Sequence, residues 1–121
     1  MTEVSAFLAE AGYSQSIQEK GLVGLLKDWS ETVKQVESGW TLTWEDYVNE
    51  IDGRRILDEV VKRVPQAAAP QLLQLDLRFR ASTTLGVCIW GEDIAKDEGW
   101  DSFQHWYYYR HPKGGFPEGS N

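Results

Sequence analysis

The segment from Pro70 to Thr84 is the most concentrated apolar stretch of the chain, and its pattern fits two structures. Its leucines and Phe79 alternate with polar residues, which is the pattern of a half-buried strand. The same residues also recur at helical spacing, and Leu, Gln and Arg are good helix formers without a branched β-carbon. Pro70 suits the first turn of a helix, where its missing N–H would be unpaired anyway. We therefore expect a helix that forms part of the core.

Three further stretches show the three-and-four spacing of amphipathic helices. A short one covers Thr2–Gly12, and the clearest covers Leu22–Glu37. The third begins after Thr43, which is a plausible N-cap with Asp46 at the third helical position, a weaker form of the capping box. Its apolar stripe changes phase at Gly53, so that either one helix bends there or two helices meet.

The pattern changes in the last third of the chain. Residues Leu85–Trp90 are largely apolar and could form a strand or a buried extended segment. A helix over Asp101–Arg110, capped by Asp101 or its neighbour, would turn Phe103, Trp106 and Tyr107 inward. This aromatic-rich segment is expected to be less regular than the helices before it.

The acidic stretch Glu92–Gly99 is expected to be exposed, and residues 113–121 are rich in Gly, Pro and Ser and are expected to form a disordered tail. Residues 1–112 are then predicted to form a single, mainly α-helical domain. We expect a compact bundle of about five helices with an irregular aromatic-rich C-terminal segment.

Composition and charge narrow the classes of function. Hydrophobic content of 41% with 26% charged residues is ordinary for a soluble globular protein, and no secretory leader or membrane-spanning run is visible, so a cytoplasmic location is expected. The net charge of −7 argues against binding to nucleic acid or to an anionic membrane, and it is compatible with a basic protein partner. The single cysteine, Cys88, has apolar neighbours and is predicted to be a buried thiol.

The residue patterns of metal sites and enzymes are not found. His105 and His111 are six residues apart, which does not place them on one helical face. Glycine-rich phosphate loops and nucleophile elbows are also missing. The sequence therefore predicts no metal, no cofactor and no catalytic residue.

Several polar residues interrupt apolar patterns, and Asp76 is the most costly of them, because a carboxylate among leucines must be paired. We expect a structural ion pair, either with Arg80 or with an arginine of the helix that ends near Val64. A ligand-binding or enzymatic site built on Asp76 and the nearby arginines is the alternative. The polar residues singled out in this way are Asn49, Arg54, Arg55, Asp76, Arg78, Arg80 and Thr84.

The aromatic run before Arg110 is the candidate contact surface. Three consecutive tyrosines cannot all face a core from an α-helix, so at least one of them is expected to be partly exposed. Tyr and Trp dominate protein interfaces, and nearby acids would suit a basic protein surface. Aromatic residues that cap the end of the bundle are an equal alternative. The partner-binding candidates are Asp93, Asp97, Glu98, Asp101, Trp106, Tyr108 and Tyr109.

One string of residues resembles a class of known proteins. The stretch Glu45-Asp-Tyr-Val-Asn-Glu-Ile-Asp-Gly-Arg-Arg-Ile-Leu57, followed by Leu75-Asp-Leu-Arg-Phe79 and Thr83-Thr84, is similar to small, acidic, mostly helical bacterial proteins. Such proteins typically end in an aromatic segment with an Arg and a Pro, as Trp106–Pro112 does, and they look like the immunity partners of secreted or contact-delivered toxins. The resemblance implies a helical fold and a cognate toxin domain, such as a nuclease, as partner.

The leading hypothesis from the sequence is therefore an immunity protein that neutralises a toxin domain by stoichiometric binding. A DNA mimic that inhibits a nucleic-acid-binding protein is a further alternative. The acids are interleaved with Lys27, Lys34, Lys62 and Arg63, so no long phosphate-like track appears.

Overall fold

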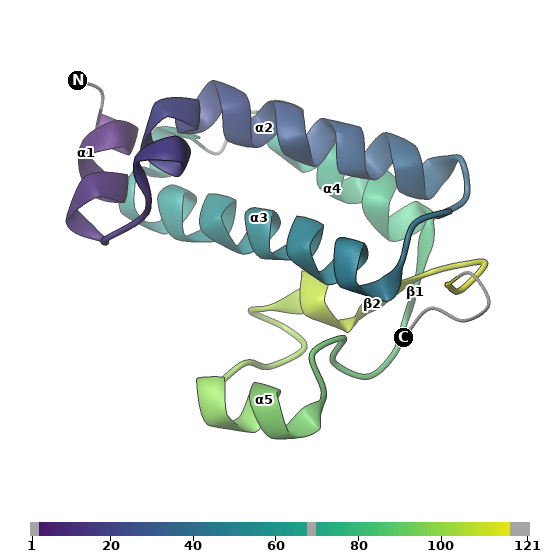
Figure 1. Ribbon diagram of the computed structural model, residues 1–121. Helices are drawn as coiled ribbons and strands as arrows, with labels where there is room; N and C mark the ends of the chain where they lie inside the picture. The colour runs from purple at the N-terminus through teal and green to yellow at the C-terminus, as the bar shows by residue number, and fades with distance from the viewer. Residues whose placement is uncertain (1–2, 68–69, 117–121) are drawn as a thin grey trace.

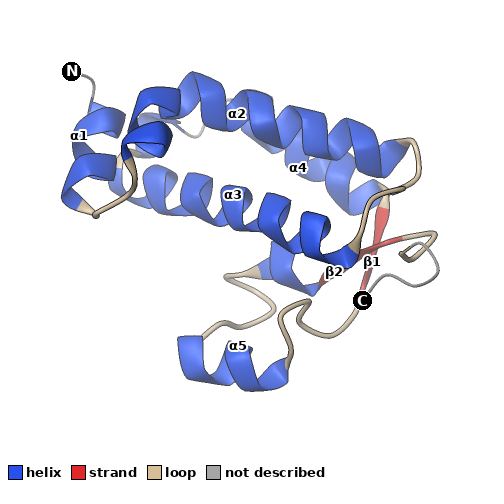
Figure 2. Cartoon of the chain, viewed as in Figure 1, coloured by secondary structure: helices blue, strands red, loops and turns tan. Residues whose placement is uncertain are grey.

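The computed structural model describes residues 3–67 and 70–116, and it has the mainly α-helical fold that the sequence predicts, with five α-helices and one small sheet in these ranges (Figures 1 and 2). The elements in chain order are α1 (Glu3–Glu10), α2 (Gln15–Glu37), α3 (Trp44–Arg63), the 3-10 helix η1 (Pro65–Ala67), α4 (Pro70–Ala81), β1 (Thr83–Leu85), α5 (Glu92–Glu98), the 3-10 helix η2 (Trp106–Tyr109) and β2 (Arg110–Pro112).

The three long helices form the body of the molecule. Helix α2 packs against both α3 and α4, and α1 contacts α2 and α3 near the end where α2 begins (Figure 1). The 3-10 helix η2 packs against α3, and Figure 1 shows α5 beyond these C-terminal turns, apart from the long helices. The chain thus places a smaller C-terminal part, residues 83–116, against one side of a helical bundle.

Helix α4 confirms the helical interpretation of the apolar segment that begins at Pro70. Leu72, Leu75 and Phe79 are buried at the spacing of one helical stripe, and the ring of Phe79 lies 4.8 Å from that of Trp29 in α2. The two other leucines of the helix are exposed. A helix at the edge of a bundle buries only the stripe that faces its neighbours.

The structure shows where helices α2 and α3 begin and whether each of them is interrupted at a glycine. Helix α3 is continuous through Gly53. Its predicted capping box is confirmed, because the Thr43 hydroxyl accepts the Asp46 N–H at 3.1 Å and the Asp46 carboxylate accepts the Thr43 N–H at 3.4 Å. Helix α2 begins earlier than expected, with Ser14 as its N-cap, and it is kinked at Gly21, where φ is 58° and ψ is −165°.

The C-terminal part corrects the prediction of a helix over Asp101–Arg110. The chain instead makes turns, the short helix η2 and the strand β2, which pairs antiparallel with β1. The Asp101 carboxylate does act as a cap, but it caps a turn, accepting the backbone N–H groups of Phe103 and Gln104. Phe103 was expected to point inward and is 88% exposed, because no helix turns it toward the core. The acidic stretch before it contains α5, a helix the sequence pattern did not indicate.

Three smaller findings complete the fold. Cys88 is buried, as predicted, and burial raises the pKa of its thiol.

The predicted tail from residue 113 begins within the described part of the chain. There Phe116 packs edge-on against Tyr47, with ring centres 5.3 Å apart. Residues 117–121 lie outside the described part. Within the described ranges, no helix has both the length and the apolar character needed to cross a membrane.

Candidate partner-binding surface

The largely buried carboxylate of Asp76 is paired with Arg54 of α3, which is the second of the two predicted alternatives, a pair between the helices and not one with Arg80. Arg54 Nε donates to Asp76 Oδ1 at 3.0 Å, and Arg54 Nη2 donates to Oδ2 at 2.8 Å. The indole N–H of Trp29 donates to Oδ1 as well, at 3.0 Å. The Arg54 guanidinium also lies 5.7 Å and 5.3 Å from the ring centres of Trp106 and Tyr107. Both carboxylate oxygens are therefore used within the fold, which favours a structural role over a ligand site.

Two of the remaining arginines stack on tryptophans. The Arg80 guanidinium carbon lies 3.9 Å from the ring centre of Trp106, and that of Arg55 lies 5.7 Å from the ring of Trp100. Such contacts hold an arginine by the electron-rich face of the ring. Both arginines therefore brace the aromatic C-terminal part against α3 and α4.

The other predicted polar residues lie at the surface. Arg78 donates two hydrogen bonds to the Glu37 carboxylate, at 2.9 Å and 2.6 Å, and this contact lowers the pKa of Glu37. Asn49 is exposed on α3 and Thr84 is exposed on β1. The structure thus separates these three positions from the buried pair of Arg54 and Asp76.

The expected exposure of at least one of the three consecutive tyrosines is wrong. Tyr107 and Tyr108 are 0% exposed and Tyr109 is 9% exposed. They are on a 3-10 helix inserted between α3 and the loop around Ile89, whose N–H donates to the Tyr108 carbonyl, and Trp100 stacks on the Tyr108 ring with centres 4.2 Å apart. Neighbours on several sides cover all three rings, so they pack inside the fold, and Trp106 is half-buried beside them.

Asp52 connects this aromatic core to α3. The Tyr108 hydroxyl donates to Asp52 Oδ1 at 2.6 Å, and the indole N–H of Trp90 donates to the same oxygen at 3.1 Å. Burial, followed by the hydrogen bond to Asp52, raises the pKa of Tyr108 and keeps it a neutral donor. Trp90 is two residues ahead of α5, so this carboxylate also holds the segment that leads into α5.

The predicted acidic positions are exposed, and the same stretch of chain also exposes Lys96 and two apolar side chains that the sequence pattern did not single out. Ile94 on α5 is 43% exposed, and Phe103 is almost fully exposed in the turn that follows. Two backbone amides lower the pKa of Asp101, which keeps it charged at neutral pH. We call this set the C-terminal acidic surface, and it consists of Glu92, Asp93, Ile94, Asp97, Glu98, Asp101 and Phe103.

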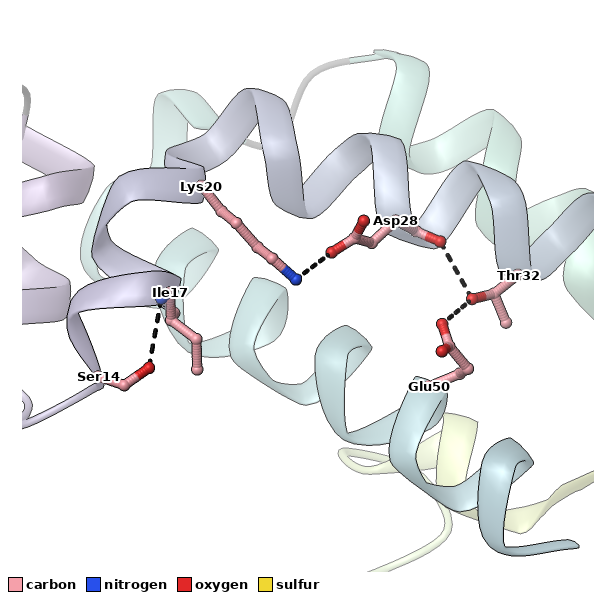
Figure 3. Close-up of polar contacts among 6 residues, drawn as sticks. All are labelled: Ser14, Ile17, Lys20, Asp28, Thr32 and Glu50. Carbon is pink, nitrogen blue, oxygen red and sulfur yellow. Dashed lines mark hydrogen bonds and ion pairs between the residues drawn. The ribbon is translucent and has the colours of Figure 1, made fainter.

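A pocket of about 300 Å³ lies between α2 and α3, near the kink of α2. Figure 3 shows how Lys20 extends from the segment ahead of the kink to Asp28 beyond it, with its Nζ 2.7 Å from the carboxylate. On the facing helix, the Glu50 carboxylate accepts the buried Thr32 hydroxyl at 2.8 Å. The residues that line the pocket are Ile17, Lys20, Leu25, Asp28, Trp29, Asn49, Glu50, Asp52, Gly53 and Ile56.

Sequence reasoning missed this pocket because its charged residues come from two helices and from both sides of a kink. The only local signal is the pair Gly21 and Gly24 inside an otherwise helical pattern. Both glycines have a structural reason. The backbone of Gly21 is in a conformation that side chains rarely adopt, and a Cβ at Gly24 would lie 2.8 Å from Lys20 Cβ.

Comparison with known proteins finds no matching family model, no matching curated protein and no matching solved structure. The chain is a mainly α-helical domain with a C-terminal acidic surface that carries exposed apolar side chains.

Proposed function

We propose that the chain is an immunity-type protein of the cytoplasm, which binds a toxin domain and neutralises it by stoichiometric inhibition, without catalysis. The observation that carries the proposal is the C-terminal acidic surface, where five exposed carboxylates accompany Ile94 and Phe103. The sequence resemblance to immunity partners of bacterial toxins supports the choice of partner.

The chemistry of this surface suits a basic protein. Carboxylates at the rim of an interface speed encounter with a basic partner and select its orientation, whereas affinity comes from apolar side chains that become buried on binding. Phe103 is the best candidate for such an anchor, because it is 88% exposed in the free chain. It replaces the tyrosines that the sequence alone suggested.

The surface is also held in place before a partner arrives. Trp100 lies two residues after the end of α5, and its ring stacks on the buried Tyr108, whose hydroxyl donates to Asp52 of α3. Ala95 is the buried residue on the inner side of α5. A surface ordered in this way loses less conformational entropy on binding than a mobile loop does.

The test is co-purification of the tagged chain with the product of the adjacent gene, together with growth of cells that produce that protein. The proposal predicts a tight one-to-one complex and rescued growth. A double charge reversal, Asp93→Lys with Asp97→Lys, is expected to weaken the complex by about tenfold or more, because like charges then face the partner. Phe103→Ser is expected to weaken it by about tenfold through loss of an anchor.

Matched controls lie on other faces of the molecule. Glu31→Lys changes an exposed charge on α2, and Leu73→Ser removes a leucine that is 63% exposed on α4. Both control variants should bind as the unmodified chain does. No complex and no rescue would refute the proposal, and equal affinity of the surface variants and controls would remove the C-terminal acidic surface from it.

A further inference from the structure

The pocket between α2 and α3 has no part in the contacts proposed above. We infer that it receives one lysine or arginine side chain of the protein partner, which is a contact separate from the C-terminal acidic surface. The inference rests on the proposed function, since it takes the partner to be a basic protein.

The lining of the pocket matches the two parts of a basic side chain. Ile17, Leu25 and Ile56 supply apolar contacts suited to an aliphatic stem, and the carboxylates of Asp28 and Glu50 are suited to a cationic head. Lysine and arginine bury their stems along apolar surface while the charged end stays near solvent or an acid. Hydrogen bonds between such a head and a carboxylate are among the stronger ones in proteins.

The chain already places one cation of this kind in the pocket. The Lys20 side chain crosses the open side of the kink to reach Asp28, as Figure 3 shows. Its hydrogen bond to Asp28 raises the pKa of Lys20, and the charge of Glu50 adds to the effect. Gly24 leaves room for the stem, because a Cβ there would lie 2.8 Å from Lys20 Cβ. This lysine of the chain itself, whose side chain is 46% exposed, shows that the lining accommodates a basic side chain.

The side chains that line the pocket include three carboxylates and one cation, so a second cation can bind there without charge repulsion from the lining as a whole. Lys20 pairs with Asp28 and also interacts with the charge of Glu50, and Arg55 interacts with the charges of both Glu59 and Asp52. Glu50 uses Oε2 to accept the Thr32 hydroxyl, and its carboxylate forms no ion pair within residues 3–67 and 70–116. A guanidinium or ammonium group beside Glu50 would neutralise the charge of its carboxylate.

One observation favours a protein side chain over a metal ion. The described part of the chain brings together no set of three acidic, histidine or cysteine residues that could hold a metal ion. Asp52 lines the pocket and also accepts the indole N–H of Trp90, two residues ahead of α5. The pocket is therefore linked through Asp52 to the segment of chain that leads into α5.

The first experiment uses the full chain without its partner. Amide NMR spectra are followed during titration with Nα-acetyl-arginine methylamide, and the neutral citrulline analogue serves as the matched probe. The arginine probe should cause saturable shifts at Gly53 and at the Asn49 side-chain amide, and the citrulline probe should not. Equal responses to the two probes, or shifts confined to other parts of the molecule, would overturn the inference.

Variants sharpen the test. Glu50→Gln keeps the oxygen that accepts the Thr32 hydroxyl and removes the charge, so it should weaken probe binding by about fivefold. Lys20→Met keeps the stem and removes the competing cation, so it should tighten binding by about twofold. Glu31→Gln is the control on the outer face of α2 and should change nothing. If Glu50→Gln fails to fold, as judged by circular dichroism, Asp28→Asn replaces it with the same expected direction.

Binding of the same variants to the partner distinguishes failure of this inference from failure of the proposed function. A complex that forms, rescues growth and has the same affinity with Glu50→Gln and Lys20→Met would refute the pocket contact and leave the proposed function intact. If no complex forms but the arginine probe and the variants behave as expected, the proposed function fails and the preference of the pocket for a basic side chain stands. Weaker binding of the partner by Glu50→Gln supports both.

Discussion

Arg54 and Asp76 join α3 to α4 through two hydrogen bonds, one to each carboxylate oxygen, with donor–acceptor distances of 3.0 Å and 2.8 Å. Their side chains are only 6% and 16% exposed. Water therefore does little to replace either partner if the other is removed. The pair aligns the two helices at the point where Trp29 of α2 also donates to Asp76, so one carboxylate connects all three long helices.

Removing one member of this pair should be costly. Asp76→Leu or Arg54→Met is expected to lower the free energy of unfolding by about 3 kcal/mol, because the remaining group loses its counter-ion in a largely buried site. The double variant Arg54→Met with Asp76→Leu should cost clearly less than the sum of the single changes. Urea unfolding followed by circular dichroism measures all three variants.

The exposed pair of Arg78 and Glu37 provides the comparison, since it has similar geometry but lies in solvent. Arg78→Met should change stability little. Equal effects of breaking the buried pair and the exposed pair would contradict the structural role given to Asp76.

The hydroxyl of Tyr108 provides a second test. Tyr108→Phe removes the hydrogen bond to Asp52 and leaves the ring in place, so we expect a loss of about 2 kcal/mol in unfolding free energy, as is usual for a bond to a charged group. Tyr109→Phe is the matched control, because the hydroxyl of Tyr109 makes only a 3.3 Å contact with the carbonyl of Trp100. The same urea measurement should show a clearly smaller loss for the control.

The helices could be predicted from the sequence because their signals are local. Leu72, Leu75 and Phe79 recur at helical spacing, and Thr43 with Asp46 forms a cap within four residues of chain. The ion pair of Asp76 was also predictable in kind, since a carboxylate in an apolar stripe must find a cation. The sequence does not show which arginine supplies this cation, because that depends on how α3 and α4 pack together.

The C-terminal part could not be predicted in the same way. The burial of Tyr107, Tyr108 and Tyr109 depends on an inserted 3-10 helix that is covered from α3 and from the loop after β1. The residues that form those covers are distant in sequence. The pocket beside Lys20 likewise depends on a kink and on a second helix, so no short stretch of sequence encodes it.

Two glycines should respond in opposite ways to alanine. Gly53 is inside the continuous helix α3 and a Cβ there would meet nothing within 4 Å, so Gly53→Ala should raise the free energy of unfolding by about 0.5 to 1 kcal/mol. Gly21 has φ of 58° in the kink of α2, and Gly21→Ala should lower the free energy of unfolding by about 1 kcal/mol or more. Thermal unfolding of both variants is the measurement, and a stabilising Gly21→Ala would contradict the kink.

Alkaline pH should destabilise the fold through its buried and partly buried tyrosines. Burial, followed by the hydrogen bond to Glu59, raises the pKa of Tyr13 from 10.0 to about 12. Burial is also the main cause that raises the pKa values of Tyr47, Tyr107 and Tyr108. Between pH 10 and pH 12 an unfolded tyrosine has largely lost its proton while Tyr13 in the folded chain keeps it. The folded state then binds more protons, and the free energy of unfolding falls as pH rises.

The contribution of these tyrosines to the free energy of unfolding is fully present below their unfolded pKa of 10.0, and it is lost progressively as the pH rises above that value. The urea midpoint should therefore decline once the pH exceeds about 10, and the slope should become shallower in Tyr13→Phe, which has one fewer group to titrate. Ultraviolet absorbance of tyrosinate, recorded on the same samples, should show the signal of the buried tyrosines appearing together with unfolding. Ionisation of Tyr108 in a chain that is still folded would contradict its burial and its hydrogen bond to Asp52.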